Sequence, residues 1–134
     1  MNETISLIIP TYNERDNIIP LVERLSRALP SHSYEIVFID DNSADGTAEL
    51  AASLSDKYPV KVTVRKNKRG LASAVVDGLS QVSSDIIAVM DADLQHPPEV
   101  IPDLLKEIKS GADIVVASRY VEGGGCQGWS LTRR

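Results

Sequence analysis

The sequence predicts an α/β fold in which a parallel sheet carries helices on both faces. Two observations predict it. Short apolar runs of strand length alternate with longer stretches whose apolar residues recur at helical spacing along most of the 134 residues. Residues 36–39, Ile-Val-Phe-Ile, are continuously apolar, as expected of a parallel strand that is covered on both faces. A regular alternation of strands and helices is typical of such a sheet.

Five short runs are predicted to be strands. They are residues 5–10, 36–39, 60–64, 86–90 and 114–117. The run 60–64 alternates apolar and polar side chains, so this strand is expected near an edge of the sheet.

Four helices are predicted between these strands. The first follows Asp16 and has one apolar stripe, with Pro20 in its first turn, where proline is tolerated. The second begins after residues 45–47, which form a plausible helix cap. The third opens at Gly70, and the fourth starts at residues 97–98, Pro-Pro. The expected order is βαβαβαβαβ, a Rossmann-like arrangement.

Length and composition exclude several classes of protein. The length fits a single domain spanning 1–134, with a βα core at 1–120 and a flexible basic end at 121–134. The net charge of −5 argues against nucleic acid as a partner. The single cysteine, Cys126, excludes an internal disulfide, and a structural zinc site lacks ligands. With neither a secretory signal nor an apolar run long enough to span a membrane, we expect a cytoplasmic chain.

Candidate functional residues follow the predicted strands, because ligands of open parallel sheets bind outside the carboxyl ends of the strands. Polar residues occupy these ends at 10–14, 40–43, 91–96 and 118–120. The glycine fingerprint of dinucleotide-binding proteins does not follow the first strand, and the P-loop pattern does not occur.

Asp91 and Asp93 are the clearest indication of a functional site in the sequence. Two carboxylates separated by one residue on an extended tip can point the same way and hold a hard divalent cation, which keeps positions for water and a substrate diphosphate. The alternative is a turn in which Asp93 caps a short helix.

Two further clusters each have a functional and a structural interpretation. Asp40 and Asp41 either stabilise a turn or accept hydrogen bonds from a nucleobase or a ribose, for which Tyr12 could supply a flat face. The basic run 65–69 either holds an anion at a helix start or is a solvated loop that offsets the acidic body.

Five segments together resemble a known family. They occur in the order IIPTYNE at 8–14, IDDNSADGT at 39–47, RGL at 69–71, MDADLQHPP at 90–98 and SRY at 118–120. The chain resembles the family 2 glycosyltransferases of the GT-A fold, and among them most the polyprenyl (dolichol) phosphate mannosyltransferases. The resemblance implies the nucleotide-binding half of such a fold.

The resemblance implies inverting transfer of a hexose, typically mannose from GDP-mannose, to a lipid-linked phosphate at a membrane surface. It implies nucleoside and diphosphate contacts from Pro10, Tyr12, Glu14, Ile39, Asp41, Asp91, Ala92, Asp93 and Arg119. Mg²⁺ or Mn²⁺ would be bound by Asp91, Asp93 and Gln95, and catalysis would rest on Asp93 and Arg119. Arg133 and Arg134 would meet the acceptor phosphate.

Family members continue beyond the equivalent of Arg134, so we expect a chain that is incomplete at its C-terminus. Such a chain would lie peripherally at the cytoplasmic face of a membrane. The sequence argues against a phospho-acceptor receiver domain, because the acidic pair follows the second strand and not the first, and Arg119 follows the fifth strand where a receiver domain has a lysine. Two alternatives stay open: glucosyl transfer from UDP-glucose to undecaprenyl phosphate, and a non-catalytic nucleotide-binding module.

Overall fold

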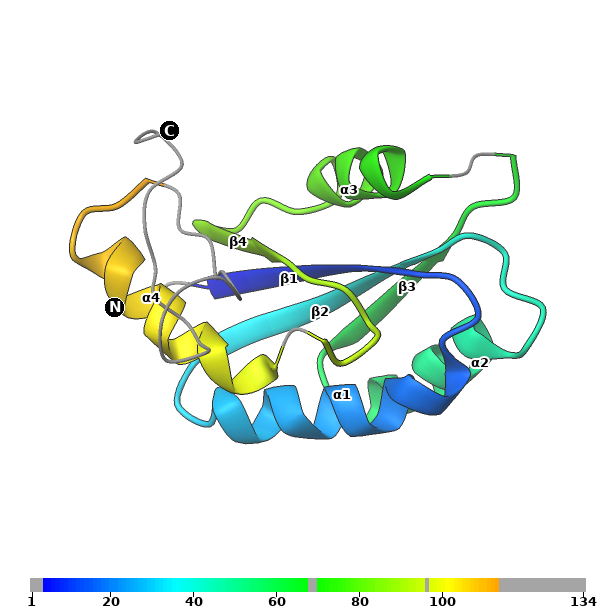
Figure 1. Ribbon diagram of the computed structural model, residues 1–134, viewed down its shortest axis with the longest axis horizontal. Helices are drawn as coiled ribbons and strands as arrows, with labels where there is room; N and C mark the ends of the chain where they lie inside the picture. The colour runs from blue at the N-terminus through cyan, green and yellow to red at the C-terminus, as the bar shows by residue number, and fades with distance from the viewer. Residues whose placement is uncertain (1–3, 68–69, 96, 114–134) are drawn as a thin grey trace. The chain divides into compact units, whose positions relative to one another are not determined.

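The computed structural model describes residues 4–67, 70–95 and 97–113, and Figure 1 shows their arrangement. The strands are β1 (Thr4–Thr11), β2 (Ser33–Asp40), β3 (Val60–Val64) and β4 (Ile86–Val89). They form one parallel sheet in the order β3-β2-β1-β4. The predicted strand at 114–117 lies outside the described residues.

The helices are α1 (Arg15–Ala28), α2 (Thr47–Ser53), α3 (Leu71–Leu79) and α4 (Ile101–Lys109), with short 3₁₀ turns η1 (Leu54–Asp56) and η2 (Pro98–Val100). Helices α1 and α2 lie on one face of the sheet and α3 lies on the other (Figure 1). The predicted parallel α/β fold with helices on both faces is therefore confirmed. Within the described ranges, none of the helices combines the length and apolar character that crossing a bilayer requires.

The chain divides into two compact units, residues 1–96 and 97–134. The first contains the whole described sheet. In the second, α4 carries Asp103 in its first turn and Lys106 and Lys109 in its last, which suits the helix dipole. The single domain expected over 1–134 stays a prediction.

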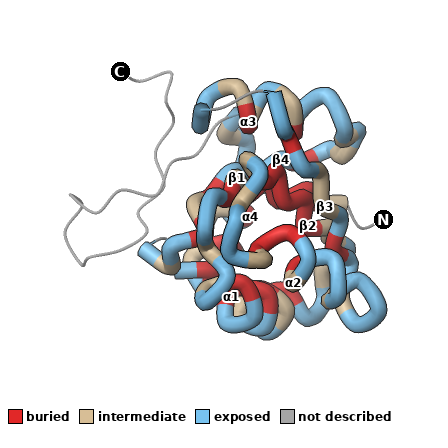
Figure 2. The backbone as a smooth tube through the Cα atoms, turned by 90° about the vertical axis from the view of Figure 1, so that its right-hand side faces the viewer, coloured by how far each residue is buried: buried red, intermediate tan, exposed pale blue. Residues whose placement is uncertain are grey.

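The core is built on the two central strands, which are buried along most of their length (Figure 2). Ile36, Val37, Phe38 and Ile39 are at most 1% exposed, because helices cover both faces of β2. From α1, the fully buried side chains are Ile18, Leu21, Val22 and Leu25. This stripe at helical spacing is the one that the sequence predicts.

Strand β3 pairs with β2 alone and stands at one end of the described sheet, as its alternating pattern predicts. The position of Pro20 differs from expectation. Helix α1 begins at Arg15, so Pro20 lies in its second turn and not in the first. The hydrogen bond that proline cannot donate would reach the carbonyl of Asp16, and both residues are exposed, so water can satisfy that carbonyl.

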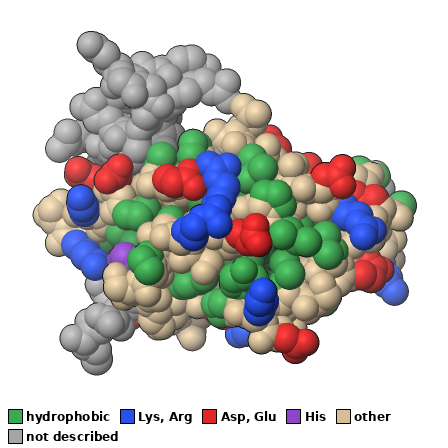
Figure 3. All heavy atoms as spheres, turned by 90° about the horizontal axis from the view of Figure 1, so that it is seen from below, with side chains coloured by type: hydrophobic (Ala, Val, Ile, Leu, Met, Phe, Trp, Pro, Cys, Tyr) green, Lys and Arg blue, Asp and Glu red, His purple; other side chains and the backbone are tan. Residues whose placement is uncertain are grey.

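The surface on the α1 side of the molecule mixes charges of both signs. Acidic, basic and apolar side chains are interspersed there (Figure 3). The carboxyl ends of the strands differ from this surface, because acidic side chains gather there.

Helix α3 approaches the sheet closely at Gly78. A Cβ built there would stand 2.6 Å from Cγ2 of Ile8, whose side chain is fully buried. Helix propensity alone would make Gly78→Ala stabilising by about 1 kcal/mol. We expect the opposite sign, a loss of about 1 kcal/mol in the free energy of unfolding, because overpacking outweighs propensity. Urea unfolding of the variant measures this loss. A gain in stability would contradict the close packing of Gly78 against Ile8.

Candidate functional site

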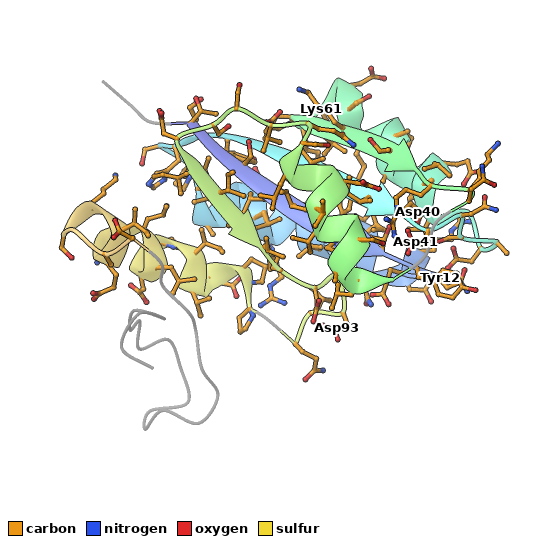
Figure 4. The ribbon with its side chains drawn as sticks, turned by 90° about the horizontal axis from the view of Figure 1, so that it is seen from above. Tyr12, Asp40, Asp41, Lys61 and Asp93 are labelled. Atoms are coloured by element: carbon orange, nitrogen blue, oxygen red, sulfur yellow. The ribbon has the colours of Figure 1, made fainter. Side chains whose placement is uncertain are left out.

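A pocket of about 230 Å³ opens at the carboxyl ends of β1, β2 and β4. It is lined by Pro10, Thr11, Tyr12, Glu14, Asp41, Leu71, Asp91, Ala92 and Asp93. Figure 4 shows Tyr12 and Asp41 close together at this end of the sheet, with Asp93 on a neighbouring loop. Seven of the residues that the sequence singled out therefore line one pocket, and Thr11 and Leu71 are additions to them.

The strand register brings these loops together. Thr11 pairs with Asp40 at the ends of β1 and β2, and the N–H of Asp41 donates to the carbonyl of Thr11 at 3.0 Å. On the other side of β1, the N–H of Met90 donates to the carbonyl of Ile8 at 3.2 Å. Three neighbouring parallel strands thus end at the same edge, which is where ligands of such sheets bind.

The two neighbouring acids Asp40 and Asp41 have different roles. Asp40 is 1% exposed and accepts hydrogen bonds from Thr11 Oγ1 at 2.7 Å and from Ser43 N and Oγ at 2.8 and 2.6 Å. It fastens the loop after β2 to the end of β1. Asp41 turns the other way and lines the pocket. Of the two interpretations left open by the sequence, the structure gives the structural one to Asp40 and a pocket position to Asp41.

Asp41 is bound by Arg65, which follows β3. Arg65 Nε donates to Asp41 Oδ1 at 2.7 Å, and the N–H of Gly70 donates to Asp41 Oδ2 at 3.2 Å. The hydrogen bond to Asp41 raises the pKa of the Arg65 guanidinium, and Asp77 adds to the effect. Neither interpretation of the basic run holds for Arg65, because its side chain is 4% exposed and paired with acids.

Asp91 and Asp93 flank Ala92 on the loop after β4. Asp91 is half-buried and Asp93 is exposed, and both reach the pocket. Asp93 Oδ1 accepts the N–H of Gln95 at 3.0 Å, which forms a tight turn, and Leu94 within it has a left-handed φ of 65°. Asp93 does not cap the short helix that follows, because the residue preceding that helix is Pro97.

The chemistry of the pair fits a divalent cation of the Mg²⁺ type. Such cations are commonly held by one or two carboxylates while water and substrate phosphates complete the coordination. Among the described residues, no group of three His, Cys, Asp or Glu side chains is placed to enclose a metal. Two hard oxygen donors at the mouth of an open pocket therefore suit a cation that arrives with a diphosphate. Gln95, the third predicted ligand, is exposed and does not line the pocket.

The opposite wall is formed by the loop after β1. Tyr12 is 49% exposed there, so its ring is accessible to a flat ligand. Asn13 has a left-handed φ of 53°, and its N–H donates to Ser43 Oγ at 2.8 Å while its Oδ1 accepts the N–H of Ala44 at 3.1 Å. These contacts brace the loops after β1 and β2 against each other and hold Tyr12 and Asp41 on one site.

Glu14, also on this wall, is supported by the cap of α2. Its N–H donates to Thr47 Oγ1 at 2.9 Å, and that hydroxyl donates to Asp45. Asp45 also accepts the N–H of Thr47 at 3.0 Å, so residues 45–47 do cap α2 as predicted. The hydrogen bond from Thr47 is the main cause that lowers the pKa of Asp45.

Replacing Thr47 with valine should raise the pKa of the Asp45 carboxyl toward its ordinary value, because the hydroxyl donor is lost. The folded pKa lies below the unfolded one, so this contribution to stability is present above the ordinary pKa and disappears as the pH falls through the folded one. NMR titration of the Asp45 carboxyl carbon measures the shift. An unchanged titration in T47V would contradict the assigned cause.

Several predicted residues are not brought to the pocket. Ile39 is fully buried in the core with Ile8, Val37 and Ala74, so its contact with a nucleoside stays a prediction. Arg119, Arg133 and Arg134 lie outside the described residues, and their roles stay predictions.

Sequence reasoning assigned neither Thr11 nor Leu71 to the site, and it treated Arg65 only as one cation of the basic run 65–69. The rule that ligands bind at strand ends was applied to the strands expected first, second, fourth and fifth. Its application to the third strand would have singled out Arg65, which directly follows Val64. Leu71 is the first residue of α3, next to Gly70, whose φ of 113° turns the chain into the helix.

Comparison with known proteins places the chain among glycosyltransferases. It is 54% identical over 130 residues to a dolichol-phosphate mannosyltransferase of Pyrococcus furiosus, covering 97% of this chain and 37% of that protein. It is 40% identical over 134 residues to one of Saccharomyces cerevisiae, covering 96% of this chain and 50% of that protein. The chain thus spans half or less of the length of these relatives.

Solved structures share the fold. A mannosyltransferase from Pyrobaculum calidifontis in complex with GDP-mannose and Mn²⁺ matches with a TM-score of 0.69 at 24% identity, covering 87% of this chain and 34% of that one. Glucosyl-3-phosphoglycerate synthase from Mycobacterium tuberculosis in complex with phosphoglyceric acid matches with a TM-score of 0.72 at 25% identity, covering 91% and 45%. The model of glycosyl transferase family 2 matches residues 6–134. The chain therefore belongs to glycosyl transferase family 2.

Proposed function

We propose that this chain is the donor-binding part of a metal-dependent enzyme that transfers mannose from GDP-mannose to a polyprenyl or dolichyl phosphate with inversion. The observation that carries the proposal is the convergence of Tyr12, Asp41 and the pair Asp91 and Asp93 on one pocket. The names of the relatives at 54% and 40% identity support mannose as the sugar and a lipid phosphate as the acceptor.

Each wall of the pocket suits one part of a nucleotide sugar. Tyr12 offers an aromatic face to the base, and Asp41 offers acceptor oxygens to its N–H groups or to the ribose. Asp91 and Asp93 would hold Mg²⁺ or Mn²⁺ beside the diphosphate. A divalent cation bound there neutralises the negative charge that develops on the leaving nucleoside diphosphate.

The acceptor needs alignment more than activation. A lipid phosphate is already anionic at neutral pH, so a strong general base is not required. The protein has to hold this nucleophile in line with the anomeric carbon, on the side opposite the leaving diphosphate. Arg119, Arg133 and Arg134 are proposed to bind the donor and acceptor phosphates. A lipid acceptor also places the enzyme peripherally at a membrane surface, for which we propose the cytoplasmic face.

Calorimetric titration of the chain with GDP-mannose and UDP-glucose, each with Mn²⁺ and with EDTA, tests the proposal. We expect GDP-mannose to bind more tightly, and only when the metal is present. Tighter binding of UDP-glucose would instead favour glucosyl transfer to undecaprenyl phosphate. Absence of metal-dependent binding of either sugar nucleotide would refute the donor site.

A transfer assay separates an enzyme from a binding module. We expect radiolabelled mannose to appear on dolichyl phosphate in detergent when GDP-mannose and Mn²⁺ are supplied to the protein. Donor binding without any transfer would favour a non-catalytic nucleotide-binding module.

A further inference from the structure

We propose that Arg65 is a positioning residue for the nucleotide pocket: its buried guanidinium fixes the carboxylate of Asp41 in the orientation that receives the nucleoside. The inference rests on the proposed function and deepens it. Arg65 itself does not line the pocket, so any effect on the ligand passes through the pocket residues that it holds in place, Asp41 first among them.

The guanidinium joins two parts of the pocket wall. Nε holds Asp41 at the end of β2, while Nη1 donates to Ser73 Oγ at 2.8 Å and Asp77 Oδ2 at 3.1 Å, both on α3. Nη2 donates to the carbonyl of Gly70 at 3.1 Å. One side chain thus fixes both Asp41 and the start of α3, where Leu71 lines the pocket. A lysine has a single nitrogen and cannot reproduce this fork.

The contacts of Asp41 leave room for a ligand. Its Oδ1 accepts from Arg65 and its Oδ2 from Gly70, while a carboxylate offers about four acceptor positions. Its side chain is 13% exposed, and that part faces the pocket. Asp41 can therefore keep both protein contacts and still accept a hydrogen bond from a base or a ribose.

The charges around Arg65 support the same positioning role. Arg65 stands between the carboxylates of Asp41 and Asp77 and neutralises one of them. Without the guanidinium, the carboxylates of Asp41 and Asp77 would lose the cation between them, and Asp41 would turn toward water. This change removes the oriented acceptor. Asp91 and Asp93 stand on a different loop, after β4, whereas the contacts of Arg65 named above reach the end of β2 and helix α3.

The chain offers a matched control on the same pair of strands. Lys61 on β3 pairs with Glu35 on β2 at 3.0 Å, just as Arg65 pairs with Asp41, but its side chain is 69% exposed. Figure 4 shows Lys61 well apart from Tyr12, Asp41 and Asp93. Lys61→Met removes the same charge from the strand that Arg65 directly follows, without touching the pocket.

The test compares two ligands, GDP and inorganic diphosphate, each titrated with Mg²⁺ into the wild-type chain, R65M, R65K and K61M. We expect R65M to weaken GDP binding by about tenfold or more, as loss of a charge-assisted hydrogen bond implies, and to leave diphosphate binding within about twofold. R65K should fall between R65M and the wild type for GDP. K61M should bind both ligands as the wild type does.

The outcomes are distinguishable. If R65M binds GDP as the wild type does, or loses GDP and diphosphate equally, Arg65 has no positioning role and acts at most on stability. If R65M does not fold, as judged by circular dichroism, R65K decides by the same comparison of ligands. If the wild-type chain binds diphosphate but not GDP, the proposed nucleotide site is wrong, and the role of Arg65 is wrong with it.

Discussion

Replacing Asp93 with alanine should abolish the metal dependence of nucleotide binding. Asp93 supplies one of the two pocket carboxylates on the loop after β4, and a Mg²⁺-type cation bound by this pair loses half of its protein ligands in the variant. Loss of outer partners of metal ligands alone costs about 10–100-fold, so we expect GDP affinity with Mn²⁺ to fall by about 100-fold. Calorimetry with Mn²⁺ and with EDTA measures it.

The control for Asp93→Ala is Asp56→Ala. Asp56 is an exposed acid in η1 and does not line the pocket, so this variant removes the same charge elsewhere. We expect it to bind GDP as the wild type does. Asp93→Ala should unfold at the same urea concentration as the wild type, because Asp93 is exposed. Retention of full Mn²⁺ dependence by Asp93→Ala would place the metal elsewhere.

Replacing Asp40 with alanine should be the most destabilising single change at this edge of the sheet. The variant leaves the donors of Thr11 and Ser43 without their acceptor in a place where Asp40 is 1% exposed. Hydrogen bonds to charged groups each contribute about 1.5–3 kcal/mol, so we expect about 3 kcal/mol less free energy of unfolding. Urea unfolding followed by circular dichroism measures the change.

Asp40→Asn separates charge from hydrogen bonding. Asparagine can keep the Oδ1 acceptor for the hydroxyls of Thr11 and Ser43 but turns an NH₂ group toward the N–H of Ser43, so we expect a smaller loss than with alanine. A change below about 1 kcal/mol for Asp40→Ala would show that Asp40 is not the fastening residue described above.

Much of the fold could be predicted from sequence because strand and helix periodicities are local properties. The continuous run 36–39 predicts a central strand, and the alternating run 60–64 predicts an edge strand. The placement of Pro20 was wrong because α1 begins at Arg15, whose N–H donates to Asp45 in a loop distant in sequence, a contact that no local pattern reveals. The closeness of Gly78 to Ile8 is likewise tertiary and leaves no periodic signal.

The sequence predicts which residues form the candidate site, but it does not predict what each of them does there. The carboxyl ends of parallel strands meet at one edge of the sheet, so the sequence alone groups Tyr12, Asp41, Asp91 and Asp93. The different roles of Asp40 and Asp41 could not be predicted from the sequence. Neighbouring side chains leave a strand end in opposite directions, and only the register of the strands shows which of the two is buried. Arg65 looked like one cation of a surface run, and only its contacts with Asp41 and Asp77 reveal it as buried.

We propose that one pocket, between the loops after β1, β2 and β4, holds both a nucleoside diphosphate and a divalent cation. Paramagnetic broadening by Mn²⁺ in the NMR spectrum of the ¹⁵N-labelled chain tests it most directly, with GDP present and absent. We predict that GDP makes the broadening strongest at the amides of Asp91, Ala92 and Asp93, weaker at Tyr12 and Asp41, and negligible at Lys61. Broadening that is centred elsewhere, or that GDP does not change, would contradict this site.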